Sequence, residues 1–180
     1  MELMMELAVA NRIATKIVHE LLPFCQRIEI AGSIRRRRPF ANDIDLVVLP
    51  KPTYAQALRE RCKRNAIRVQ SDGEMNLIVT LPYAPAGPDG LQLDIFIASQ
   101  PVGDLFHTSS TNFGTLLVCR TGSAKHNVKL CGRAHQLGLR WNPYQGVYDG
   151  HGVCLARATE EEVFQALRLD FIPPENREVL

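Results

Sequence analysis

Two short motifs near the N-terminus carry residue types that phosphoryl chemistry needs. Gly32-Ser33 follows a short apolar-alternating run, and Asp43 and Asp45 come ten residues later, directly before the apolar run Leu46–Leu49. Two neighbouring carboxylates repel each other and lose solvation, so a divalent cation such as Mg²⁺ is a favourable partner. The Gly-Ser turn offers backbone N–H groups, a hydroxyl and adjacent arginines, which suit a polyphosphate. Together these groups predict phosphoryl transfer.

Two plainer interpretations of the same residues stay open. Arg35–Arg38 can be a solvated turn, and Asp43 can simply begin a strand after Asn42. We expect the functional interpretation because the Gly-Ser turn and the two carboxylates occur together, each at the end of a predicted strand.

A third carboxylate interrupts the apolar run 91–98. The strand period of two places Asp94 on the same face as Gln92 and Phe96, opposite the more apolar face. A carboxylate in such a strand is costly without a counter-charge. It either pairs with an arginine in a structural role or joins Asp43 and Asp45 in a three-carboxylate metal site. We expect the metal site, because perturbed carboxylates cluster at functional sites.

The elements that position these residues follow from hydrophobic periodicity. The sequence predicts helices at 3–21 and 54–62 and strands at 26–31, 43–49, 66–70, 75–81 and 91–98. The last two strands form a hairpin across the Pro- and Gly-rich residues 82–90. The outer face of the second helix, with Arg59, Arg61, Lys63 and Arg64, is expected to be solvated. This order predicts an α+β fold with a mixed sheet over residues 1–101, and a second subdomain over 102–180.

The second subdomain begins with a long basic segment. Residues 105–148 contain no Asp or Glu but five arginines and lysines. Lys125, Lys129 and Arg133 lie four residues apart, on one side of a helix that starts at Ser123. The packing contacts of that helix are expected from Ala124, Val128, Cys131 and Ala134. We expect Lys125, Lys129, Arg133 and Arg140 to bind nucleic-acid phosphates, although a merely solvated basic helix is the alternative. Further on, Thr159 and Glu162 predict a capping box.

Bulk composition restricts the protein class only in part. The formal net charge of the 180 residues is +2, which decides nothing about a nucleic-acid partner. Five scattered cysteines without metal-ligand spacing indicate reduced thiols. The start MELMMEL lacks the basic region of a signal peptide, and no apolar run has membrane-spanning length. We therefore expect a cytoplasmic, soluble monomer that has no membrane partner.

With these motifs in order, the chain resembles a known family. Gly-Ser with Asp-x-Asp is typical of the nucleotidyltransferase superfamily, and the full set resembles the palm and thumb of a family X DNA polymerase, the group of DNA polymerase beta. The matching blocks are Ala31–Arg36, Asp43–Val48, Leu93–Phe96, Thr121-Gly122-Ser123 with Asn127, Trp141–Tyr144, Glu160–Phe164 and Ile172–Arg177. The resemblance implies a nucleotidyltransferase palm at 1–101 and a small α/β thumb at 102–180. We expect a minimal form without the lyase domain and fingers of other members.

The resemblance also implies roles for individual residues. Asp43 and Asp45 would bind two Mg²⁺ ions, for which Mn²⁺ can substitute, and Asp94 would bind the catalytic ion and accept the proton of the primer 3′-hydroxyl. Nucleoside triphosphate contacts would come from the Gly-Ser turn and from the thumb, namely Gly32, Ser33, Arg36, Arg120, Thr121, Gly122 and Asn127. Two positions depart from the family pattern. Cys119-Arg120 replaces an aromatic pair, which leaves deoxyribose selection open, and Cys131 replaces a minor-groove arginine, which leaves template checking open.

The leading expectation is a DNA-directed DNA polymerase of repair type, which adds nucleotides to a primer at short gaps. Its partners would be a nucleoside triphosphate and primer–template or gapped DNA. The alternative is a template-independent or non-DNA nucleotidyltransferase that acts on an RNA end, a protein or a small molecule. A third possibility is a non-catalytic module that binds nucleic-acid ends.

Overall fold

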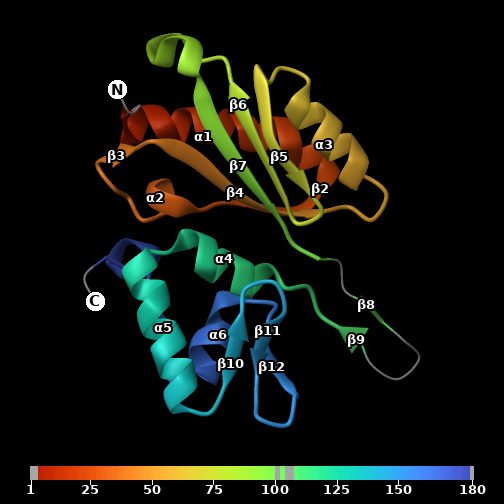
Figure 1. Ribbon diagram of the computed structural model, residues 1–180, viewed down its shortest axis with the longest axis vertical. Coiled ribbons are helices and arrows are strands. Elements are labelled where there is room, and N and C mark those ends of the chain that lie inside the picture. Colours follow the sequence, from red (N-terminus) through yellow and green to blue (C-terminus); the bar gives the residue numbers. More distant parts are fainter. Residues whose placement is uncertain (1–3, 100–101, 104–107, 179–180) are drawn as a thin grey trace. The chain divides into compact units, whose positions relative to one another are not determined.

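The computed structural model describes residues 4–99, 102–103 and 108–178. The chain divides into an N-terminal unit, Met1–Ile97, and a C-terminal unit, Ala98–Leu180 (Figure 1). The boundary expected near Gln100-Pro101 lies outside the described residues. Each unit has its own hydrophobic core. Helices and a mixed sheet occur together, which confirms the predicted α+β class.

A five-stranded mixed sheet forms the N-terminal unit, in the order β2-β4-β7-β6-β5. Its strands are β2 (Cys25–Ile30), β4 (Asp43–Pro50), β5 (Arg68–Gly73), β6 (Asn76–Leu81) and β7 (Leu91–Ile97). β4 and β7 are parallel, and the other neighbours are antiparallel. β6 and β7 form the predicted hairpin, across the 3₁₀ helix η2 (Ala84–Asp89). The short strands β1 (Met5–Glu6) and β3 (Phe40–Ala41) pair separately.

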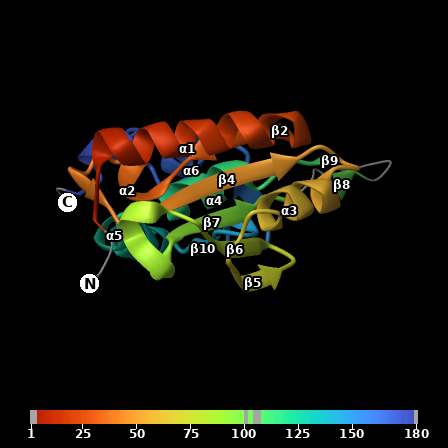
Figure 2. The same ribbon diagram turned by 90° about the horizontal axis from the view of Figure 1, so that it is seen from above.

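Two helices cover one face of this sheet. The helix α1 (Leu7–Leu21) and the helix α3 (Ala55–Lys63) contribute to a single core with the sheet, and Figure 2 shows α1 running along the sheet. The sheet side of this core consists of alternate residues, among them Ile44, Leu46 and Val48 of β4 and Leu91, Leu93 and Ile95 of β7. Because side chains alternate along a strand, Asp43, Asp45 and Asp94 project from the other face.

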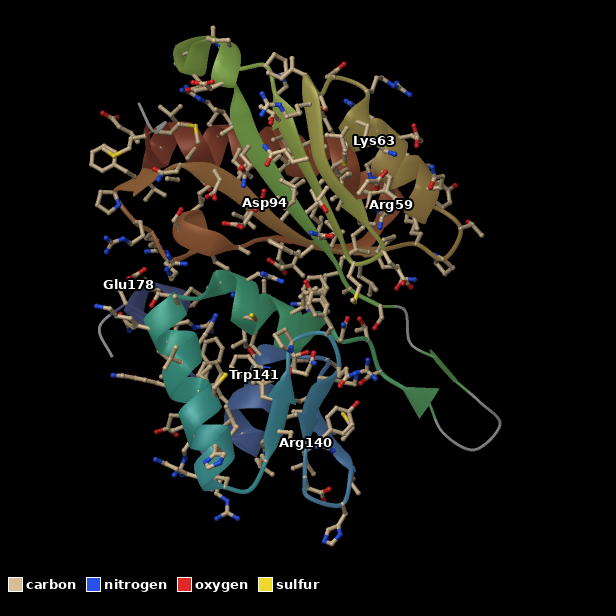
Figure 3. All side chains as sticks on the ribbon, viewed as in Figure 1. Arg59, Lys63, Asp94, Arg140, Trp141 and Glu178 are labelled. Atoms are coloured by element: carbon tan, nitrogen blue, oxygen red, sulfur yellow. The ribbon has the colours of Figure 1, made fainter. Side chains whose placement is uncertain are left out.

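The basic residues of α3 are not only solvated, so that prediction was wrong for three of them. Arg61 forms an ion pair with Glu20 of α1. Arg59 and Lys63, labelled in Figure 3, both contact the carboxylate of Asp72 on β5, at 2.6 and 2.8 Å. A second Arg59 nitrogen donates to the carbonyl oxygens of Gly73 and Glu74, both at 2.7 Å. These contacts join α3 to the β5–β6 turn.

The C-terminal unit combines three helices with a three-stranded antiparallel sheet. Its helices are α4 (Phe113–Thr121), α5 (Ala124–Gln136) and α6 (Glu160–Ala166), and its sheet consists of β10 (Arg140–Asn142), β11 (Gly146–Tyr148) and β12 (Cys154–Ala156). In the same unit, β8 (Val102–Gly103) pairs with β9 (Thr108–Ser109), and η3 (Pro174–Asn176) is a 3₁₀ turn. The N-terminal unit also contains the one-turn helix α2 (Gly32–Arg35) and the 3₁₀ turn η1 (Leu22–Phe24). α4 packs closely on the start of α6, since a methyl group at Gly114 would lie 2.2 Å from the backbone of Thr159. Thr159 and Glu162 form the predicted capping box.

A buried ion pair fastens the C-terminal segment to this unit. Arg177 is fully buried, and its Nη1 lies 2.8 Å from Oε1 of Glu160, the first residue of α6. Its Nε donates to the carbonyl oxygen of Ile172 at 2.9 Å. The guanidinium lies 5.2 Å from the ring centre of Phe164 and 5.6 Å from that of Phe171.

The packing face of α5 differs from the prediction. The buried residues are His126, Leu130 and Ala134, spaced by four, whereas Ala124, Val128 and Cys131 are exposed. The prediction assigned the buried face by apolar type, but a neutral imidazole takes one of the core positions here. Of the helices in the described ranges, none has both the length and the apolar character needed to span a membrane.

Candidate metal and nucleotide site

Three carboxylates meet on the face of the N-terminal sheet opposite α1 and α3. The parallel register of β4 and β7 places the Cα of Asp45 opposite that of Asp94, and Asp43 lies two residues earlier on the same face. One oxygen atom from each of Asp43, Asp45 and Asp94 lies within 4.8 Å of the other two. All three side chains are half-buried. Figure 3 labels Asp94 on β7.

This donor set suits a hard divalent cation. Mg²⁺ and Mn²⁺ prefer carboxylate oxygens, and three negative charges this close together are stabilised by positive charge between them. The half-buried position leaves each carboxylate a path to solvent and to a ligand. In addition, Nε2 of Gln92 donates to Oδ1 of Asp94 at 2.9 Å, so one lone pair of that carboxylate is already fixed in direction.

Gly32 lies directly against Asp45. A methyl group at position 32 would lie 1.8 Å from Oδ2 of Asp45, and the glycine adopts a φ of +58°. The backbone N–H of Ala31 donates to the carbonyl oxygen of Asp45 at 2.8 Å, which holds the two segments together. Only glycine combines this backbone conformation with the space that the carboxylate needs.

Ser33 and Arg36, which are predicted to bind phosphate, follow Gly32 in the same turn. The Oγ atom of Ser33 is buried and has no hydrogen-bond partner among the residues that the structure describes. A buried hydroxyl without a partner is costly, so it is an available donor for an anionic ligand. Arg36 is half-buried at the end of the same turn, where its backbone N–H donates to the carbonyl oxygen of Gly32 at 3.2 Å.

The other predicted nucleotide contacts gather where α4 ends and α5 begins, in the C-terminal unit. Nη2 of Arg120 donates to the hydroxyl of Tyr144 at 2.6 Å, and Thr121 is buried. Gly122 follows with a φ of +71°, and its N–H donates to the carbonyl oxygen of Val118 at 3.2 Å. Nδ2 of Asn127 donates to the carbonyl oxygen of Cys119 at 2.8 Å, while its buried Oδ1 has no partner within the described ranges.

The predicted nucleic-acid contacts divide into two groups. Lys125 and Lys129 are exposed on α5, and Arg140 is exposed on β10. Arg133 is half-buried instead, and its Nε donates to the carbonyl oxygen of Leu167 at 3.1 Å. Lys125, Lys129 and Arg140 thus reach solvent, whereas Arg133 also connects α5 to the end of α6. Contact of all four with DNA stays a prediction.

Two features of the site were missed from the sequence alone. Gln92 precedes Asp94 by two residues, so strand alternation placed both on one face, but the hydrogen bond between them was not inferred. The contact of Gly32 with Asp45 carries no local signal, because it arises from the pairing of β2 with β4.

One comparison with known proteins bears on the C-terminal unit. Residues 116–178, from within α4 to the residue after Arg177, match the DNA polymerase beta thumb family. No curated protein matches the chain. The C-terminal unit is therefore similar to a family X polymerase thumb. The match does not include the three carboxylates, which lie in the N-terminal unit.

Proposed function

We propose that the chain is a nucleotidyltransferase of the family X polymerase type, which adds nucleotides to a primer 3′-hydroxyl at short gaps in DNA. The observation that carries this proposal is the convergence of Asp43, Asp45 and Asp94 beside Gly32 and Ser33. The similarity of residues 116–178 to a DNA polymerase thumb supports a nucleic acid as the substrate.

In this proposal, the carboxylates act as metal ligands. Asp43, Asp45 and Asp94 would hold two Mg²⁺ or Mn²⁺ ions, whose charge stabilises the triphosphate and the departing pyrophosphate and lowers the pKa of the attacking hydroxyl. Asp94 also accepts the proton of that hydroxyl, in an orientation that the hydrogen bond from Gln92 maintains. The Ser33 hydroxyl donates to a phosphate oxygen, and the Arg36 guanidinium neutralises phosphate charge.

The C-terminal unit supplies contacts with nucleic acid and base. The exposed ammonium groups of Lys125 and Lys129 neutralise backbone phosphates. Asn127 presents an amide oxygen that no described residue uses, and this oxygen accepts a hydrogen bond from the incoming nucleotide. Template reading is weaker in this proposal, because the position one turn after Asn127 is the exposed Cys131.

That same position favours a second candidate function, a nucleotidyltransferase without a template. A thiol at residue 131 makes no charge-assisted hydrogen bond to a template base, whereas an arginine does. Arg120 supports this candidate too, because it replaces an aromatic residue of the family pattern. It donates a hydrogen bond to the hydroxyl of Tyr144, and its guanidinium lies 5.6 Å from the centre of the Tyr144 ring.

A single assay separates the candidate functions. A gapped duplex, an unpaired DNA 3′ end and an RNA primer are each offered with Mg²⁺ and one nucleoside triphosphate at a time. Incorporation of the templated nucleotide at the gap supports the polymerase, and incorporation regardless of template supports the second candidate. If no substrate is extended with either Mg²⁺ or Mn²⁺, both candidates are wrong, and a module that only binds nucleic-acid ends remains.

Asp94→Asn tests the role of the carboxylates directly. We expect incorporation to fall by roughly three orders of magnitude or more, since the amide neither ligates the metal as well nor accepts the proton. Nucleotide binding, measured by calorimetry, should change much less. Asp89→Asn is the matched control, because Asp89 is an exposed acid at the end of η2 in the same unit. Equal and mild effects of both substitutions would remove Asp94 from the mechanism.

A further inference from the structure

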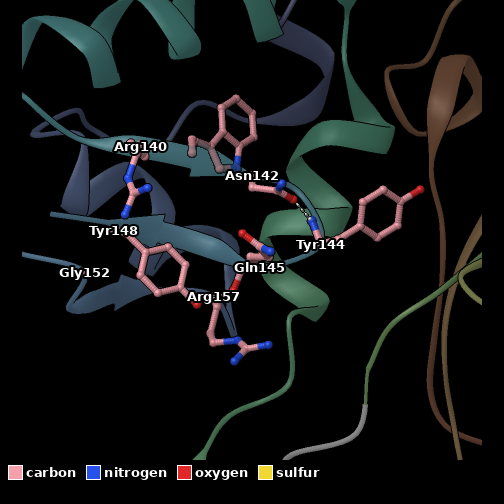
Figure 4. Close-up of a pocket in the computed structure, with 8 residues that line it drawn as sticks. Arg140, Asn142, Tyr144, Gln145, Tyr148, Gly152 and Arg157 are labelled. Carbon is pink, nitrogen blue, oxygen red and sulfur yellow. Dashed lines mark hydrogen bonds between the residues drawn. The ribbon is translucent and has the colours of Figure 1, made fainter. Parts of the chain in front are cut away.

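A pocket of about 680 Å³ lies on the small sheet of the C-terminal unit, and none of its lining residues belongs to the strands that hold the carboxylates (Figure 4). Arg140 on β10 stands directly opposite Tyr148 on β11, and both line the pocket. On the other face of this sheet, Val147 of β11 and Ala156 of β12 belong to the core. The pocket is thus formed by the outer face of the sheet, together with Arg157 just after β12.

The pocket is cationic. Arg140 and Arg157 line it, and no acidic residue is among the lining residues, all of which lie in the described part of the chain. Arg140 is exposed, and its side chain makes no hydrogen bond or ion pair with any described residue. For Arg157, the nearest side-chain partner is Oγ of Ser99 at 3.5 Å, and its buried Nε has none in the described ranges. The adjacent acid, Asp149, accepts from the N–H groups of His151 and Val153 at 2.9 Å and so closes its own turn.

The pocket also contains an aromatic ring beside these charges. In Figure 4, the ring of Tyr148 lies between the side chains of Arg140 and Arg157. Its hydroxyl donates to the carbonyl oxygen of Gln145 at 3.2 Å, which holds the ring at one end. An aromatic ring between two guanidinium groups combines a surface for a planar base with donors for the phosphates on either side.

We propose that this pocket binds one nucleotide of a single-stranded nucleic acid, with the base on Tyr148 and the neighbouring phosphates on Arg140 and Arg157. The volume is in the usual range of sites for small organic ligands, so it can admit a nucleoside with a phosphate. A duplex cannot bind in this way, because its paired bases stack on each other and do not expose their faces to a side chain. The proposal goes beyond nucleotide transfer, and it holds whether or not the carboxylates catalyse a reaction.

The chain contains its own reporter for this site. Trp141 is the only tryptophan of the protein; it borders the pocket, and its side chain packs against the core on the other face of β10. We expect a short oligothymidylate to change the Trp141 fluorescence of the full chain saturably, at low salt and with EDTA present to prevent catalysis. An abasic oligomer of the same length should bind at least about tenfold more weakly, because stacking of one base on an aromatic side chain is worth that much. A blunt duplex should also bind at least about tenfold more weakly by the same reporter.

Substitutions at Tyr148 separate stacking from charge. Tyr148→Phe should retain binding, whereas Tyr148→Leu should weaken it about tenfold or more while the free energy of unfolding shows that the fold is kept. Arg140→Ala and Arg157→Ala should each reduce the salt dependence of binding by about one phosphate contact. Lys16→Ala, which removes an exposed charge from α1 in the other unit, serves as the control and should change neither quantity.

The result that overturns the proposal is equally specific. The proposal is wrong if the abasic oligomer or free thymidine monophosphate binds as tightly as the oligothymidylate, or if Tyr148→Leu binds like the unsubstituted protein. Comparison of oligodeoxyuridylate with oligouridylate, which share one base, then identifies the preferred sugar, and binding of either one supports the proposal. The Asp94→Asn protein should bind the oligomer normally, so a failure of the catalytic proposal does not count against this site.

Discussion

At the scale of single residues, the missing side chain of Gly32 is as important as the carboxylates themselves. Asp45 can occupy its position because residue 32 has no Cβ; a methyl group there would lie 1.8 Å from Oδ2 of Asp45. The same glycine begins the turn that presents Ser33. Its small size therefore serves both the carboxylate cluster and the expected phosphate contacts.

Gly32→Ala should weaken metal binding, and a second glycine provides a matched control. Gly87 has a φ of +59°, nearly the same as the +58° of Gly32, but a methyl group there meets nothing within 4 Å. Both substitutions incur a backbone cost of about 1–3 kcal/mol in the free energy of unfolding, yet only Gly32→Ala displaces Asp45. We expect Mn²⁺ affinity, measured by calorimetry, to fall about tenfold or more in Gly32→Ala and to stay unchanged in Gly87→Ala. Equal affinities would show that Asp45 does not ligate the metal.

His126 should make the protein less stable in mild acid. Burial, and secondarily the nearby Arg177, lower the pKa of His126 from 6.5 to about 4. The unfolded chain therefore takes up a proton before the folded one does, so stability is full above pH 6.5 and is lost as the pH falls towards 4. The loss from this group approaches about 3 kcal/mol at the acid end.

The measurement is denaturant unfolding of the protein and of His126→Phe across this pH range. His126 already lies 6.0 Å from the ring centre of Phe164, so a phenylalanine is a suitable replacement. The difference in unfolding free energy between the two proteins should move in favour of the variant as the pH falls. His135→Phe, at an exposed position of the same helix, should leave the pH dependence as it is. A difference that does not vary with pH would contradict the prediction.

At the scale of elements, α5 contains a glycine that its fold does not require. Gly132 is helical and exposed, and a methyl group there has open space. Gly132→Ala should therefore stabilise the protein by about 0.5–1 kcal/mol, measured as the free energy of unfolding. Gly138, two residues beyond the end of the helix, also has open space but a φ of +69°. Gly138→Ala should accordingly destabilise by about 1 kcal/mol, and the same sign for both would show that backbone conformation does not decide the outcome.

Elements were predictable where local pattern decides the structure. Alternation along β4 and β7 identified the apolar face, and the Thr159–Glu162 spacing identified the start of α6. The packing face of α5 was not predictable by residue type, because His126 is buried while Val128 is 71% exposed. The pocket on β10–β12 was not predictable either, because it depends on the pairing of β12 with β11, which places Arg157 next to that strand. Packing and pairing between distant segments, rather than composition, determined these last two features.

At the scale of the whole molecule, a formal net charge of +2 conceals an uneven distribution of charge along the chain. All of the acidic residues lie outside residues 105–148, where five arginines and lysines occur. Counterion release therefore predicts that affinity for duplex DNA falls as salt rises, with a slope of log affinity against log salt near −0.9 per phosphate contacted.

The double substitution of Lys125 and Lys129 by alanine should make that slope less negative by about 2, because both ammonium groups are exposed. Binding at several salt concentrations, followed by fluorescence anisotropy of a labelled gapped duplex, measures the slope. Lys16→Ala is again the control, since α1 covers the face of its sheet opposite the carboxylates. A slope that the double substitution leaves unchanged would assign the DNA contacts to other residues.

The parallel register of β4 and β7 also limits how the gene can change in length. Insertion of one codon between Leu91 and Asp94 would reverse the face of every later side chain in β7 and turn the carboxylate towards α1 and α3. An insertion in residues 82–90 would spare the strand, because that loop lies outside the ladder. Functional descendants of this sequence should therefore vary in length before Leu91 and be constant from there to Asp94.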